Sequence, residues 1–184
     1  MPNKSLTVKV PGKLMVAGEF AVLEPYQELI VMAVDRFVYA TVEDSDENLL
    51  TLENFGLHRL RWNDQNNGVH IDSNDKRVNF VEQAISVVSV YLREQSIPMA
   101  PFALRINSEL DDRGVKYGLG SSAAVVTAVI TAILNKCLTD PPPRKLIFKL
   151  AAISHVKTQG NGSGADIAAS TYGGFLQYSS FQAD

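Results

Sequence analysis

The sequence predicts an α+β domain in which helices cover one face of a mixed β-sheet. The first half of the chain holds short runs with strand patterns, and the second half holds apolar runs with helical spacing. No internal repeat, linker or low-complexity tract divides the 184 residues, a length that suits one domain with its own core. Because strands come first and helices later, the pattern favours α+β over an alternating α/β fold.

The predicted strands begin near the N-terminus. Leu6 to Val10 alternates apolar and polar side chains, as a half-buried strand does, and Pro11-Gly12 is expected to end it. The Asn- and Asp-rich stretch 63–76 and the acidic stretch 108–114 are expected to be loops. Further β-rich runs predict strands at 29–34, 37–42, 49–52, 57–62, 102–106 and 175–178.

Helical periodicity starts at Val78. Apolar residues between Phe80 and Leu92 fall on one helical face, and Pro98 stops that helix region. Prolines 141–143 separate the two helices that follow. In all, helices are expected at 78–92, 125–134, 146–158 and 165–171.

Composition excludes several classes of function. The formal charge of −3, with no basic run, gives no reason to expect a nucleic acid or an anionic membrane as partner. The single cysteine, Cys137, rules out an intrachain disulfide and is expected to be a small core residue. No signal peptide or run of transmembrane length is present, so a cytoplasmic protein is expected.

The most informative stretch is Gly118-Leu119-Gly120-Ser121-Ser122-Ala123, which leads into an apolar helix. Glycines let backbone N–H groups turn inward, and a helix N-terminus attracts anions, phosphate above all. Ser121 can cap this helix, so a plain glycine turn with a serine cap is the simpler alternative.

The two better-known phosphate loops do not fit this stretch. A Walker A loop requires Gly-x4-Gly-Lys-Ser/Thr, which the sequence lacks. Gly118-x-Gly120-x-x-Ala123 matches the dinucleotide fingerprint, but that fold requires a central strand after the helix. Here prolines 141–143 follow, and proline is excluded from a central strand.

Two further segments hold candidate site residues. Lys13 follows Pro11-Gly12 among small apolar residues, an unusual place for a solubilising charge. Gly160-Asn161-Gly162-Ser163-Gly164 precedes Asp166, which is expected in the first turn of a helix. Each residue also has a simpler interpretation when taken alone. Lys13 could be a solvated surface lysine, and Asp166 could be an aspartate that only stabilises a helix N-terminus.

Taken in order, the three segments resemble the GHMP kinase superfamily of galactose, homoserine, mevalonate and phosphomevalonate kinases. Within it, the segments Gly18–Pro25, Ala33–Phe37 and Gln159–Asp166 are most similar to the bacterial phosphomevalonate kinase branch. The resemblance covers essentially the whole chain. It implies an ATP- and Mg²⁺-dependent transfer of the γ-phosphoryl group to 5-phosphomevalonate, giving 5-diphosphomevalonate.

The resemblance also implies roles for individual residues. Lys13 and Asp166 would be catalytic, and the acceptor would lie against Lys13, Glu19, His155 and the segment Gly162-Ser163-Gly164. A serine hydroxyl, Ser121 or Ser122, would reach Mg²⁺, and Ser122 is taken as the metal ligand. The ATP phosphates would lie on Gly118, Leu119, Gly120, Ser121, Ser122 and Ala123.

Two positions modify these expectations. Mevalonate kinases carry a metal-binding glutamate where this chain has His155, and an imidazole suits an acceptor with an extra phosphate better than a carboxylate would. Asp166 is either a base or a group that orients Lys13, because a phosphate acceptor with its second pKa at about 6 is already mostly dianionic at neutral pH. A histidine that merely faces solvent or core is the alternative at position 155.

The resemblance further implies a second, C-terminal domain that residues 1–184 do not contain. The chain by itself is therefore expected to be weakly active or inactive and to expose an apolar face, through which it could self-associate. Two alternatives stay open. One is mevalonate kinase or another small-molecule kinase of this superfamily, and the other is a non-catalytic half-kinase that only binds nucleotide.

Overall fold

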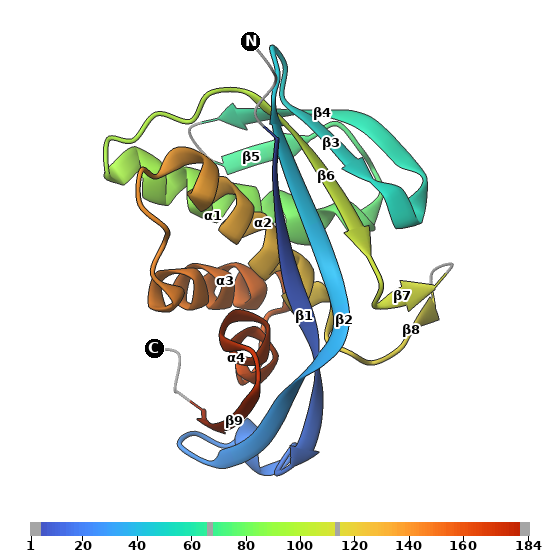
Figure 1. Cartoon of the computed structure of the whole chain (residues 1–184), viewed down its shortest axis with the longest axis vertical. Helices are drawn as coiled ribbons and strands as arrows, with labels where there is room; N and C mark the ends of the chain where they lie inside the picture. The colour runs from blue at the N-terminus through green and yellow to red at the C-terminus, as the bar shows by residue number, and fades with distance from the viewer. Residues whose placement is uncertain (1–4, 66–67, 113–114, 181–184) are drawn as a thin grey trace.

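A seven-stranded mixed sheet forms the framework of the chain, seen in the computed structural model, which describes residues 5–65, 68–112 and 115–180 (Figure 1). Its strand order is β1-β2-β6-β3-β4-β5, with β9 paired to one end of β2. The pairing of β3 with β6 is parallel and the others are antiparallel. The strands are β1 (Ser5–Ala17), β2 (Glu28–Asp44), β3 (Leu49–Leu52), β4 (Leu57–Gln65), β5 (Gly68–Ile71), β6 (Phe102–Ser108) and β9 (Phe175–Ser179).

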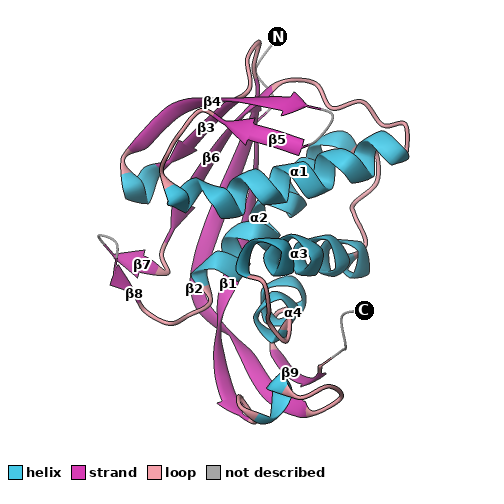
Figure 2. Cartoon of the chain, turned by 180° about the vertical axis from the view of Figure 1, so that it is seen from behind, coloured by secondary structure: helices cyan, strands magenta, loops and turns pink. Residues whose placement is uncertain are grey.

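Four α-helices lie on one face of this sheet (Figure 2). They are α1 (Asn79–Glu94), α2 (Ser121–Cys137), α3 (Arg144–Gln159) and α4 (Ala165–Tyr172). The predicted α+β class, with helices on one face of a mixed sheet, is therefore confirmed. Among the described residues, no helix combines the length and apolar character that a membrane span needs.

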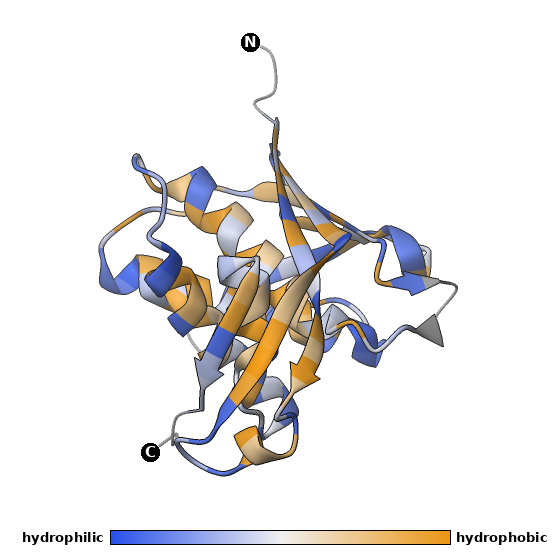
Figure 3. Ribbon diagram, turned by 60° about the horizontal axis from the view of Figure 1, so that its bottom comes forward, coloured by the Kyte–Doolittle hydropathy of each residue, from blue (hydrophilic) through white to orange (hydrophobic). Residues whose placement is uncertain are grey.

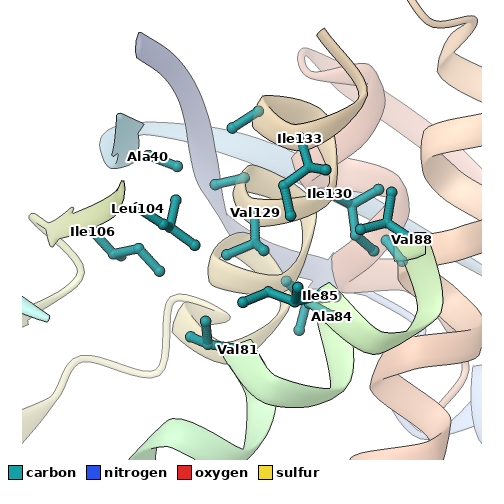
Figure 4. Close-up of a cluster of buried hydrophobic side chains, with 14 of the residues drawn as sticks. Ala40, Val81, Ala84, Ile85, Val88, Leu104, Ile106, Val129, Ile130 and Ile133 are labelled. Atoms are coloured by element: carbon teal, nitrogen blue, oxygen red, sulfur yellow. The ribbon is translucent and has the colours of Figure 1, made fainter. Parts of the chain in front are cut away.

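Helix α2 is the centre of the core. It packs against β1 and β2 on one side and against α1 and α3 on the other, so it is apolar nearly all round. Figure 4 shows Val129, Ile130 and Ile133 of α2 between sheet residues such as Leu104 and α1 residues such as Ile85. Cys137, at the end of α2, is half-buried against this core as predicted, and burial raises the pKa of its thiol. The N-terminus of α2 is thereby held rigidly at the edge of the core.

The strand predictions were wrong in four places. The runs 29–34 and 37–42 form the single strand β2. β1 continues through Pro11-Gly12, with a register shift between Pro11 and Lys13. Pro11 is tolerated there because β1 is an edge strand, paired only with β2 among the described strands, and an edge strand can accept a proline. The stretch 63–76 contains the end of β4 and all of β5, and the stretch 108–114 contains β7 (Asp111–Asp112) of a short hairpin with β8 (Val115–Lys116).

The paired ends of β1, β2 and β9 extend below the helices (Figure 1). The short 3-10 helix η1 (Ala21–Leu23) connects β1 and β2 at this end. Figure 3 shows hydrophobic colour along the strands that come forward at the bottom. The large exposed apolar side chains of this region, called the lower apolar strip below, are Leu14, Val16, Phe20, Leu23, Tyr26 and Phe175.

Candidate active site

The first glycine loop is held against β1 by direct backbone contact. The Lys13 amide donates to the Leu119 carbonyl at 2.8 Å. Gly118 and Gly120 adopt left-handed φ angles of 74° and 71°. A Cβ on Gly120 would lie 2.9 Å from Cγ of Lys13, so the lysine stem lies directly against the loop. The structure therefore brings Lys13 and the glycine loop together, as the sequence analysis expected.

The N-terminus of α2 is open to an anion. Gly120 is the N-cap residue and no side chain caps the helix. The first backbone N–H groups of a helix have no partner within it, and they carry the positive end of the dipole. The predicted cap by Ser121 is wrong, because Ser121 is the first helical residue and its hydroxyl donates to Oδ2 of Asp111 at 2.6 Å.

Asp111 is a site residue that the sequence analysis missed. It is only 8% exposed and comes from the hairpin that precedes the glycine loop. The hydroxyl of Ser108 also points to it, at 3.4 Å from Oδ2. The hydroxyl of Ser121 is engaged by this carboxylate, whereas the hydroxyl of Ser122 lies against His155 of α3.

Ser122 meets His155 across the gap between α2 and α3. The Ser122 hydroxyl lies 3.3 Å from Nε2 of His155, which is 4% exposed. The imidazole stacks on Phe80 with ring centroids 5.6 Å apart. Burial lowers the pKa of His155, and the nearby charge of Asp166 acts in the opposite direction. His155 is thus a buried residue of this site that favours the neutral form, rather than a solvent-facing histidine.

The second glycine loop joins this cluster from the other side. A Cβ on Gly162 would lie 3.9 Å from Nδ1 of His155. Asp166 lies in the first turn of α4, as predicted, and its Oδ1 accepts from the Ile167 amide at 3.0 Å. Ser163 accepts on its hydroxyl from the Ala165 amide at 3.3 Å.

Tyr178 contacts the second loop from β9 and was also missed. Its hydroxyl donates to the backbone carbonyl of Ser163. Burial, with a smaller contribution from the charge of Asp166, raises the pKa of Tyr178 to about 12. Glu19, in contrast, lies in the exposed turn after β1, and no contact joins it to either glycine loop within the described ranges.

We expect the chain to lose stability between about pH 10 and pH 12 through Tyr178. An unfolded tyrosine ionises near pH 10 and the folded one near 12, so the neutral form favours the folded state. This contribution is complete below pH 10 and is lost as the pH rises through 12. Urea unfolding at stepped pH should show a shallower decline for Tyr178→Phe than for the wild type. Parallel curves would contradict the assignment.

A cavity of about 220 Å³ opens beside the N-terminus of α2. Its walls combine the aromatic rings of Phe55 and Phe80 with aliphatic side chains, and Ser121 and Ser122 also line it. Lys76 and Arg77 belong to the same lining, and the Arg77 guanidinium lies 4.5 Å from the centre of the Phe55 ring. A largely apolar cavity beside an uncapped helix N-terminus suits a nucleotide, which has a flat base and a phosphate chain.

This geometry places two glycine loops at the N-termini of the neighbouring helices α2 and α4, an arrangement that suits anion binding. The chain belongs to the GHMP kinases, because residues 79–174 match the description "GHMP kinases N terminal domain".

Among its relatives, the phosphomevalonate kinase of Streptomyces sp. (strain CL190) is 32% identical over 187 residues, covering 96% of this chain and 50% of that protein. The mevalonate kinase of Archaeoglobus fulgidus is 30% identical over 169 residues, covering 92% of this chain and 51% of that protein. The chain therefore spans about half the length of these curated relatives.

Solved structures show the same fold. A Lin0012 protein from Listeria innocua superposes with a TM-score of 0.88 at 40% identity, over 97% of this chain and 49% of that one. The Streptococcus pneumoniae phosphomevalonate kinase, in complex with phosphomevalonate and AMPPNP, superposes with a TM-score of 0.81 at 27% identity, over 96% of this chain and 50% of that one.

Proposed function

We propose that this chain is the nucleotide-binding half of an ATP-dependent kinase that phosphorylates 5-phosphomevalonate. The observation that carries the proposal is the uncapped N-terminus of α2 beside an apolar cavity. The base would enter the cavity and the phosphates would lie on Gly118 to Ala123. Phosphoryl transfer depends mainly on positioning and charge neutralisation, which this loop and Lys13 supply together.

The acceptor would lie on the second glycine loop. Ser163, with the flexible backbone of Gly162 and Gly164, would bind the phosphate of the acceptor, and Asp166 and Lys13 would face the transferring group. A neutral His155 favours an acceptor that carries its own phosphate, because it adds no negative charge. Glu19 is a weaker candidate for acceptor binding, since its turn is exposed.

The residues present fit a Mg²⁺ ion that arrives with ATP. Mg²⁺ is bound by one or two protein oxygens together with phosphates and waters, and it offsets charge on the transferring group. Ser122 offers a hydroxyl and Asp166 a carboxylate on neighbouring helix termini. No group of three or more His, Cys, Asp or Glu side chains that could hold a metal occurs among the described residues, so a dedicated all-protein cage is not what the site offers.

Titration of the purified chain with AMPPNP and Mg²⁺ tests the nucleotide site. We expect saturable binding by calorimetry, and ADP release in a coupled assay with 5-phosphomevalonate rather than mevalonate or homoserine. Turnover with mevalonate alone would favour the second candidate, a mevalonate kinase, which the Archaeoglobus fulgidus relative supports. Nucleotide binding without turnover, with or without a second half supplied in trans, would favour a binding module.

We further propose that a second half, as in the relatives of twice the length, packs on the lower apolar strip. Phe20 is 78% exposed there, and Leu23 and Phe175 are exposed as well. Large apolar patches on a soluble domain mark interaction surfaces. This chain covers 49% of the Listeria innocua protein, so the rest of that protein can be supplied in trans to test the contact.

Without a partner, we expect the chain to self-associate through the lower apolar strip. Sedimentation should show a mass that rises with concentration, and Phe20→Ser with Phe175→Ser should return it to the monomer. Val90→Ser is the matched control, because Val90 is an exposed apolar residue on α1. A monomer at all concentrations, or equal effects of both changes, would contradict this use of the strip.

A further inference from the structure

Tyr178 connects the second glycine loop to the sheet. It lies on β9, where it pairs with Leu29 of β2, and its hydroxyl donates to the Ser163 carbonyl at 2.5 Å. Its ring packs edge-on against Phe148 of α3, with centroids 6.5 Å apart. One side chain thus contacts the loop, a helix and, through its own strand, the sheet.

The loop needs such an external contact. Gly160, Gly162 and Gly164 have φ angles of 86°, 144° and 80°, which glycine adopts without strain but does not hold by itself. Glycine loses more backbone freedom on ordering than any other residue, so a loop with three of them is fixed by its contacts. The Ser163 carbonyl lies in the middle of this segment. A hydrogen bond to that atom therefore restricts the peptide plane that joins Ser163 to Gly164.

We propose that Tyr178 is a positioning residue that sets the orientation of Ser163 and of the backbone amides around it toward the phosphate of the acceptor. This inference rests on the proposed function, because that function places the acceptor on this loop. The phenol of a tyrosine is protonated at physiological pH, and burial with the charge of Asp166 raises the pKa of Tyr178 further, to about 12, so its hydroxyl remains a donor.

Loss of the Tyr178 hydroxyl is expected to change the affinity for the acceptor and not the affinity for the nucleotide. The contacts of Tyr178 described above are with the second loop and α3, whereas the first glycine loop is held by the backbone of β1. Losing one hydrogen bond to the loop should weaken acceptor binding about three- to tenfold. Nucleotide affinity should stay within about twofold, because Gly118 to Ser122 keep their own support.

Tyr178→Phe removes the hydroxyl and keeps the ring against Phe148. Tyr172→Phe is the matched control, since Tyr172 also packs on Phe148, at 6.0 Å between centroids. The Tyr172 hydroxyl makes no hydrogen bond to the second loop in the described part of the chain. Both variants are compared with the wild type by calorimetry, using AMPPNP alone and then 5-phosphomevalonate with AMPPNP present, and by amide hydrogen exchange of residues 160–166.

Weaker acceptor binding and faster loop exchange in Tyr178→Phe, with neither change in Tyr172→Phe, would support the proposal. It would be overturned by equal losses of nucleotide and acceptor affinity, or by loop exchange that matches the control. A wild type that binds no phosphate ester would instead refute the proposed function. Hydrogen exchange, which needs no ligand, would in that case still decide whether Tyr178 restrains the loop.

Discussion

Gly120→Ala should lower the affinity of the chain for ATP by about 100-fold or more. Two effects act at this position. An alanine at a φ of 71° is strained by about 1–2 kcal/mol, which lowers the stability of the fold. Its Cβ would also lie 2.9 Å from Cγ of Lys13, closer than real Cβ atoms come to a neighbour, and 3.1 Å from Cε, so the second effect displaces the lysine stem. Lys13 must then move, and the loop loses both its shape and its cation.

Gly118→Ala separates the two effects. Gly118 has nearly the same backbone conformation, with a φ of 74°, but nothing lies within 4 Å of a Cβ placed there. Both variants should lose about 1–2 kcal/mol of stability in urea unfolding. Only Gly120→Ala should lose most of its ATP binding, measured by calorimetry. Equal losses of affinity would mean that the contact with Lys13 does not matter.

The spacing of apolar residues was sufficient to predict the helices but insufficient to predict parts of the sheet. The apolar face from Phe80 to Leu92 predicts α1 because many residues repeat the same spacing. β5 is only four residues long, Gly68 to Ile71. It is stabilised by pairing with β4 and by the Glu82 carboxylate, which accepts a hydrogen bond from the Ile71 amide at 2.8 Å. A strand that depends on distant partners leaves little local pattern.

The residues of the candidate site also differ in whether a local sequence pattern identifies them. Its glycines, Lys13 and Asp166 lie in local motifs, so the sequence identifies them. Asp111 and Tyr178 reach the loops only through tertiary packing, and no local spacing marks them. The cap by Ser121 was expected from local chemistry alone. It fails because a buried carboxylate is a stronger acceptor for that hydroxyl, and it lies 2.6 Å away.

Lys13→Met should lower kcat by about 100- to 1,000-fold, and Asp166→Asn should lower it by much less. Methionine keeps the apolar stem that lies against Gly120 and removes the charge. That charge would offset the negative charge of the transferring and accepting phosphates. Lys13 is the cation whose stem lies against the glycine loop, whereas Lys76 and Arg77 line the neighbouring cavity. A phosphate acceptor with its second pKa at about 6 needs no base at neutral pH, so Asp166 would orient rather than abstract.

The measurement is coupled ADP release at saturating ATP and 5-phosphomevalonate, with the second half of the Listeria innocua protein supplied if the chain alone is inactive. Lys9→Met is the control for net charge, because Lys9 is an exposed cation on the same strand as Lys13. The Lys9 ammonium lies over the ring of Phe37, 3.9 Å from its centre. It should leave kcat within about twofold. Equal losses for Lys13→Met and Asp166→Asn, or the reverse order, would contradict an orienting role for Asp166. If Asp166 acts on a proton, the loss in Asp166→Asn should then grow further below pH 6, where the acceptor phosphate gains a proton that a base must remove.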